Sequence, residues 1–173
     1  MGISVRLSSP EAMGRSEKEP EHRLHVVDLG SGVTFFPFSV AKLGYHVTCV
    51  DTDPIVAVDV PKAAKVVKHE PGKVDCRFCE EGRLPFDDDE VDALYCISVL
   101  EHIPHFERTI EEIARILKPR GLLVLTIDLD LRGDQAIGMK DHARLMQWLD
   151  EYFDIGSPSR MVHPMDMLSS QRS

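Results

Sequence analysis

Four short segments carry polar residues that could bind a small ligand, and each follows an apolar run. The first is Asp28-Leu29-Gly30-Ser31-Gly32, in which two glycines let the backbone turn sharply and approach a ligand closely. The others are Asp51, Glu80 and residues 97–102, ISVLEH. A carboxylate at Asp51 could accept hydrogen bonds from both hydroxyls of a ribose, and Glu80 could accept one from an adenine amino group.

Alternating strand and helix patterns are expected to position these segments. Apolar, partly β-branched runs predict strands over residues 24–29, 45–50, 74–78, 91–98 and 122–127. Cap residues and spaced apolar positions predict helices over 36–43, 106–117 and 141–153, and one from Asp53-Pro54 that Pro61 interrupts. The alternation predicts an α/β fold, a doubly wound and mainly parallel sheet with helices on both faces. Ligands of such sheets bind beyond the carboxyl ends of the strands, where all four segments would meet.

The length of 173 residues fits one domain. Residues 1–23 are polar and broken by Pro10, Gly14 and Pro20, so we expect a flexible N-terminal arm there and the folded domain over 24–173. These first residues lack the apolar stretch of a signal peptide, and no long apolar run follows. We therefore expect a cytoplasmic protein with no membrane segment.

Charge and cysteine content narrow the classes of partner. A net charge of −9, spread along the chain, gives no general attraction to phosphate backbones and disfavours a nucleic-acid substrate.

Cys76 and Cys79 form a C-x-x-C pair, which could begin a zinc or redox site. No second pair follows and the segment reads as a strand, so we expect buried, reduced thiols and no metal.

Taken in order, four stretches resemble those of one family. They are VVDLGSG at 26–32, VTCVDTDP at 47–54, LPFDDDEVDALYCISVLEHI at 84–103 and LKPRGLLVLTID at 117–128. Together they resemble class I S-adenosylmethionine (SAM)-dependent methyltransferases over about residues 24–130. The resemblance implies a Rossmann-like fold, SAM as cofactor and transfer of its methyl group. Since no motif for nucleic-acid base or protein-arginine methylation is visible, a small-molecule acceptor is the expectation.

The resemblance also implies roles for matching residues. The expected cofactor-binding set is Gly30 and Gly32 under the methionine part, Asp28 holding that loop beside the positive groups, Asp51 on the ribose, Glu80 and the Glu81 backbone on the adenine, and Ser98 near the methyl group.

An oxygen or nitrogen acceptor can also need a general base. His102 follows the fourth strand and is the candidate, although a loop or capping role is the favoured explanation for it. Glu101, His105 and Asp128 are weaker candidates.

The sequence departs from the family pattern in two places. Thr34 stands where a third glycine is usual, and we expect it to cap the following helix instead. The family's sheet normally ends in two further strands, one antiparallel, whereas here residues 153–161 leave room for one at most. An uncovered edge at 122–127 would invite pairing, so we expect a homodimer through that edge or a longer native chain.

Two other readings stay open at the level of sequence. An NAD-binding loop would need a glycine where Phe35 stands, and an acid two residues before the first glycine suits a cation better than a phosphate. A non-catalytic protein with the SAM-binding fold, serving as a partner or regulator, is the second alternative, because fold alone does not establish activity.

Overall fold

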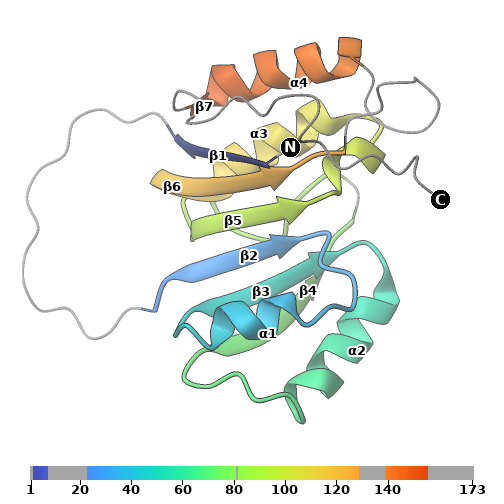
Figure 1. Cartoon of the computed structure of the whole chain (residues 1–173), viewed down its shortest axis with the longest axis vertical. Helices are drawn as coiled ribbons and strands as arrows, with labels where there is room; N and C mark the ends of the chain where they lie inside the picture. Colours follow the sequence, from blue (N-terminus) through green and yellow to red (C-terminus); the bar gives the residue numbers. More distant parts are fainter. Residues whose placement is uncertain (1, 8–22, 81, 129–138, 156–173) are drawn as a thin grey trace, which may run out of the picture.

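The computed structural model describes residues 2–7, 23–80, 82–128 and 139–155. Seven strands form one sheet in the order β4-β3-β2-β5-β6-β1-β7. Five of them follow the central part of the chain: β2 (His25–Leu29), β3 (His46–Asp51), β4 (Lys73–Phe78), β5 (Val91–Ile97) and β6 (Leu117–Thr126). These five pair in parallel, as the alternation of strands and helices predicts (Figure 1). The α/β, Rossmann-like sheet is therefore confirmed.

Helices cover both faces of this sheet. They are α1 (Phe36–Ala41), α2 (Pro54–Ala64), α3 (Phe106–Ile116) and α4 (Met139–Tyr152), with the 3₁₀ turn η1 (Leu100–His102) before α3. Side chains of a strand alternate between faces, and the packing follows this rule. Val47 and Cys49 of β3 pack in the clusters that contain α1 and α2, whereas Val50 packs in the cluster of α3 and α4.

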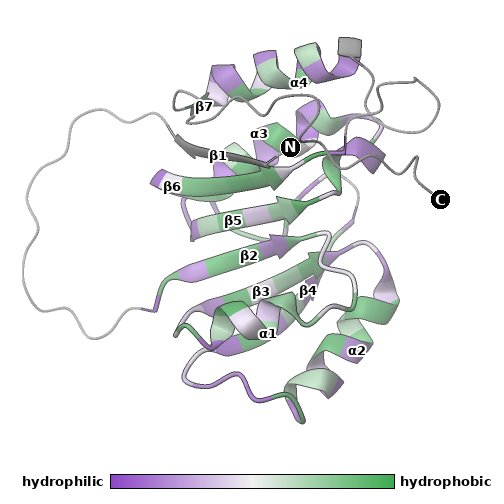
Figure 2. Cartoon of the chain, in the orientation of Figure 1, coloured by the Kyte–Doolittle hydropathy of each residue, from purple (hydrophilic) through white to green (hydrophobic). Residues whose placement is uncertain are grey.

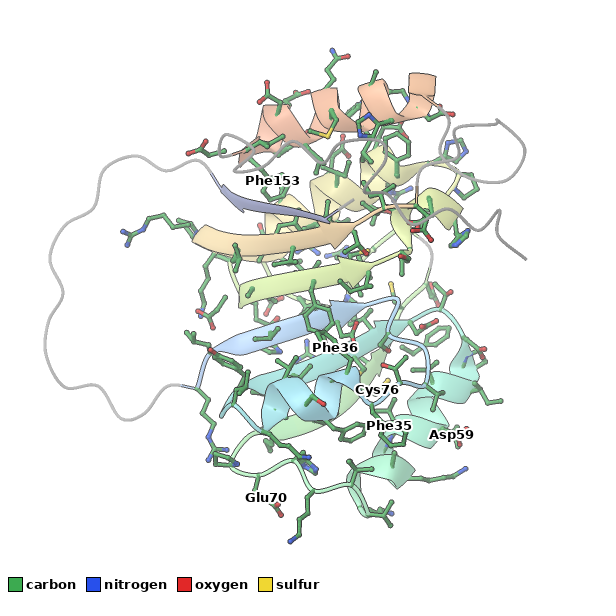
Figure 3. All side chains as sticks on the ribbon, viewed as in Figure 1. Phe35, Phe36, Asp59, Glu70, Cys76 and Phe153 are labelled. Carbon is green, nitrogen blue, oxygen red and sulfur yellow. The ribbon has the colours of Figure 1, made fainter. Side chains whose placement is uncertain are left out.

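Hydropathy follows this layering closely. Figure 2 shows the central strands mainly hydrophobic, and α3 and α4 with hydrophobic and hydrophilic residues alternating along them. All five residues of β2 are buried because strands and helices surround it on both faces and both edges. On the α1 side the ring of Phe36, labelled in Figure 3, packs edge to face against the ring of Tyr95 of β5, with 5.2 Å between the ring centroids. The core thus fixes the strands whose ends carry the polar segments.

The prediction that Pro61 interrupts the second helix is wrong. Pro61 lies inside α2, which runs unbroken from Pro54 to Ala64. Proline lacks the N–H of a helical bond and costs a helix interior roughly 3 kcal/mol. Val56 and Val60 of α2 are buried against Phe38 and Cys49, and this tertiary packing outweighs the local cost.

The N-terminal residues differ most from expectation. Gly2–Leu7 are not a flexible arm but strand β1, which pairs antiparallel with β6 from Gly2↔Thr126 to Arg6↔Leu122. The short strand β7 (Phe153–Asp154) pairs with the other edge of β1. Residues 8–22 lie outside the described part of the chain.

This arrangement corrects the prediction about the sheet edge. The antiparallel strand expected near the C-terminus comes from the N-terminus, and β6 has a partner on both sides. The edge at 122–127 is therefore not free, and it gives no reason to expect a homodimer. A strand over residues 153–161 is seen only as β7, and residues 156–173 lie outside the described structure.

Candidate active site

The carboxyl ends of the parallel strands open into a cleft of about 560 Å³. Gly30, Asp51 and Glu80, from the ends of β2, β3 and β4, line it together with His102 and His105 beyond β5. Its volume lies in the range of small-molecule sites. The structure thus brings together residues from all four segments that the sequence singled out.

Gly30 lies where no other residue fits. Its φ is +70°, and a Cβ atom added to it would come within 2.5 Å of Val99 Cγ2. Its N–H donates to the Val50 carbonyl at 2.8 Å, which ties the loop to β3. Because Val99 also lines the cleft, the glycine lets the loop after β2 and the segment after β5 meet at its floor.

Asp51 organises the glycine loop. Its Oδ2 accepts a 2.8 Å hydrogen bond from the Gly32 N–H, and its Oδ1 accepts a 2.9 Å bond from the Asp53 N–H. Each carboxylate oxygen can accept a second bond, so capacity remains for a ligand. Asp53 caps α2 through the Ile55 N–H at 2.9 Å, which separates the roles of the two acids.

Asp28 is buried within β2 and is not among the residues that line the cleft. It is only 5 % exposed, and among the described residues it makes no hydrogen bond to the glycine loop. Burial raises the pKa of its carboxyl to about 7, and the negative charge of Asp51 adds to the rise. The expected loop-holding role belongs to Asp51 instead.

Ser98 faces the end of β6. Its φ is +52°, its N–H donates to Thr126 Oγ1 at 3.0 Å, and its hydroxyl lies 3.4 Å from the same oxygen. It is not among the residues that line the cleft, where its neighbour Val99 stands instead. A place for Ser98 beside the methyl group therefore stays a prediction.

The candidate bases separate into two groups. The exposed side chains of His102 and His105 border the cleft. Glu101 instead accepts a 3.0 Å bond from the Asp128 N–H, and neither of these two lines the cleft. Glu80 is exposed at the cleft, while Glu81 lies outside the described residues.

Thr34 does not cap the following helix. Phe35 occupies the cap position of α1 and makes no side-chain capping bond, and Thr34 itself is exposed. The expectation was wrong because Pro37 enters the first turn and removes one of the backbone donors that a cap would satisfy.

Sequence reasoning missed a group of polar residues from the 82–84 loop and from α3. Arg83, Arg108, Thr109 and Glu112 all line the cleft. Their spacing gave one signal: Arg108 and Glu112 are four residues apart and therefore share one side of α3, away from its buried Ile110. This spacing predicts an exposed face of α3. It does not predict that the loop after β4 packs against that face.

The C-x-x-C pair is part of the scaffold. The Cys79 thiol donates to the Glu80 and Arg83 carbonyls at 3.1 Å each, and burial raises its pKa. In the described ranges, no three His, Cys, Asp or Glu residues are grouped so as to hold a metal ion. These bonds shape the loop that carries Glu80 and Arg83.

Sequence comparison identifies the family. The model of the methyltransferase domain matches residues 27–125, which span the strand ends and the cleft described above. This chain belongs to the methyltransferase domain family. The resemblance to class I SAM-dependent methyltransferases is thereby confirmed, and their cofactor is SAM.

Relatives of this methyltransferase domain act on different acceptors. A sterol 4-C-methyltransferase of Caenorhabditis elegans is 28% identical over 142 residues, which cover 82% of this chain and 41% of that protein. A ubiquinone biosynthesis O-methyltransferase of Xylella fastidiosa is 33% identical, over 85% of this chain and 61% of that protein. The chain therefore spans about two fifths to three fifths of these two relatives.

A solved structure agrees with these relatives. A SAM-dependent methyltransferase of Methanosarcina mazei superposes with a TM-score of 0.56 at 25% identity, covering 61% of this chain and 53% of that one.

Proposed function

We propose that this chain is a SAM-dependent methyltransferase that acts on a small molecule. The observation that carries the proposal is the cleft itself, where a glycine loop, Asp51 and Glu80 meet at the carboxyl ends of three neighbouring strands. The names of the relatives, a sterol and a ubiquinone-pathway methyltransferase, support a small-molecule acceptor.

The residues of the cleft fit SAM by their chemistry. Gly32 has open space where a Cβ would stand, so the ligand's methionine part could lie against bare backbone at Gly30 and Gly32. Asp51 retains acceptor capacity for the ribose hydroxyls, and Glu80 would accept from the adenine amino group, with the backbone of Glu81 beside it. Asp28, buried within β2, would favour a cationic ligand once ionised.

Bound SAM supplies a methyl group on a positively charged sulfur, which an acceptor atom can displace in line. The chain's own contribution is to align the acceptor and to exclude water. His102 and His105 border the cleft and are the candidates to take the proton that an oxygen or nitrogen acceptor loses. Val99 and Ile103 add apolar surface to the same cleft.

Two measurements test the proposal. Calorimetry with SAM, S-adenosylhomocysteine (SAH) and NAD should give binding of the first two and none of the third. A screen of metabolite pools should then release SAH. Tight NAD binding without a response to SAM would overturn the assignment, and SAM binding without turnover on any pool would favour the non-catalytic regulator.

We also propose a cytoplasmic location. All four cysteines are free thiols, and three of them are buried, as suits a reducing compartment. No helix in the described ranges is long and apolar enough to cross a membrane. Fractionation of cells that express the tagged chain would test the location.

A further inference from the structure

The cleft has two walls of opposite charge. Asp51 and Glu80 lie at the strand ends. The basic wall carries Arg83 from the loop after β4 and Arg108 from α3, and His102 and His105 of the segment before Arg108 line the cleft as well. The acids match a cationic cofactor. A cationic cofactor does not explain the basic wall. Positive side chains gathered in one place are also unexpected in a chain with a net charge of −9.

Within the described structure, Arg83 and Arg108 make no ion pair, whereas Arg77, Arg115 and Arg144 each pair with a carboxylate. Glu112, an acid that lines the same cleft, is already bound to other residues. Its two oxygens accept from Arg115 at 2.9 and 2.7 Å, and Oε2 also accepts from the Leu84 N–H at 2.9 Å. Arg115 accordingly holds the pKa of Glu112 down, with only a smaller effect from Arg83.

The structure also places the Arg108 head group. A Cβ atom added to Gly82 would lie 3.1 Å from Cζ and Nε of Arg108, so the guanidinium rests directly on the glycine backbone. The φ of Gly82 is +90°, a conformation that favours glycine. The loop thus leaves space for this guanidinium at Gly82, the residue before Arg83, and both arginines line the cleft.

We propose that the methyl acceptor carries an anionic group, a carboxylate or a phosphate, and that Arg83 and Arg108 bind it. Guanidinium groups recognise both anions through paired N–H···O bonds. His102 and His105 lie on the same wall and would face the rest of the acceptor. The inference rests on the proposed function, since it names the class of acceptor for the same cleft.

The test separates the anion from the cofactor. Inorganic phosphate and acetate are titrated separately by NMR into the full chain with and without SAH, using wild type, Arg83→Gln, Arg108→Gln and Arg120→Gln. Arg120 is an exposed arginine near the start of β6, outside the cleft, and serves as the matched control. We expect at least fivefold weaker binding of one anion in both cleft variants, and less than a twofold change in the control.

The affinity for SAH should stay within threefold in all four proteins. Equal anion binding across them, or none by wild type, would overturn the inference. Lost SAH binding in Arg108→Gln with unchanged anion binding would do the same, because it assigns Arg108 to the cofactor. A wild-type chain that binds no SAH refutes the proposed function instead, and the anion titration without SAH remains readable.

The metabolite screen supplies a second readout. Acceptors that release SAH should be acids, with a KM at least tenfold higher in Arg108→Gln and a similar kcat. A neutral acceptor whose kcat/KM is unaffected by Arg108→Gln would contradict the inference.

Discussion

Replacing Gly30 by alanine tests the contact between the glycine loop and the segment after β5. The residue has a φ of +70°, which costs an L-residue about 1–2 kcal/mol. Its Cβ would also stand 2.5 and 2.6 Å from the two Cγ atoms of Val99, and such overpacking typically costs about 1–3 kcal/mol. We therefore expect Gly30→Ala to lower the free energy of unfolding by about 2–5 kcal/mol.

Gly32→Ala is the matched control. Its φ of +51° carries the same backbone cost, but nothing lies within 4 Å of an added Cβ. We expect a loss of only about 1–2 kcal/mol in urea titrations followed by circular dichroism.

Val99→Ala should rescue part of the loss, because it removes both clashing methyl groups and leaves Val99 Cβ, which is 3.1 Å away. A double-mutant cycle of Gly30→Ala and Val99→Ala should give a favourable coupling of about 1–3 kcal/mol. Equal costs for the two glycine variants together with zero coupling would refute the steric argument.

Three further predictions concern the strand ends and the sheet edge. Asp51→Ala should lower the free energy of unfolding by about 2 kcal/mol, since it removes two hydrogen bonds to a charged acceptor. It should also weaken SAM binding at least tenfold, as measured by calorimetry. The control variant Asp53→Ala should lose about 1 kcal/mol of helix capping and bind SAM normally. Because the pKa of Asp28 is raised from 3.8 to about 7, its stabilising effect is complete below pH 3.8 and is lost as the pH rises through 7. Relative to Asp28→Asn, wild type should therefore lose about 2–4 kcal/mol between pH 4 and 8 in urea titrations, and parallel pH curves would contradict the assigned burial. Deleting residues 1–7 should expose the β6 edge and cause concentration-dependent association in light scattering, whereas an unchanged monodisperse profile would show that β1 is dispensable.

The sequence predicted the parallel strands well, because β2, β3, β5 and β6 contain short apolar runs with a turn or cap behind them, and the edge strand β4 alternates polar and apolar residues. It predicted the meeting of Gly30, Asp51 and Glu80 for the same reason, since parallel strands end at one edge. Strand β1 was not predicted from the sequence. It has only six residues, Gly2–Leu7, in a polar region, and its pairing with β6 depends on residues far away along the chain.

The side chains were harder to predict than the backbone. Asp28 and Asp51 both follow the pattern of an acid at the end of a strand. Among the described residues only Asp51 bonds the loop, and Asp28 is buried within β2. Arg83 and Arg108 resemble ordinary surface arginines in the sequence. Their place in the cleft follows from Gly82, whose missing side chain lets loop and helix approach each other.

The pairing of β1 with β6 has a consequence for biosynthesis. Strand β1 (Gly2–Leu7) precedes β2 to β5 in the chain but bonds to residues 122–126, so its partner is absent until all of these strands have been synthesised. Domains form from the N-terminus as the chain emerges, and pairings between distant segments are slow because the intervening loop must first close. Strands β2 to β5 can assemble in order before that point. Closure of the sheet by β1 is therefore a late event, and until then β6 is the site where a nascent chain is most exposed to wrong pairing.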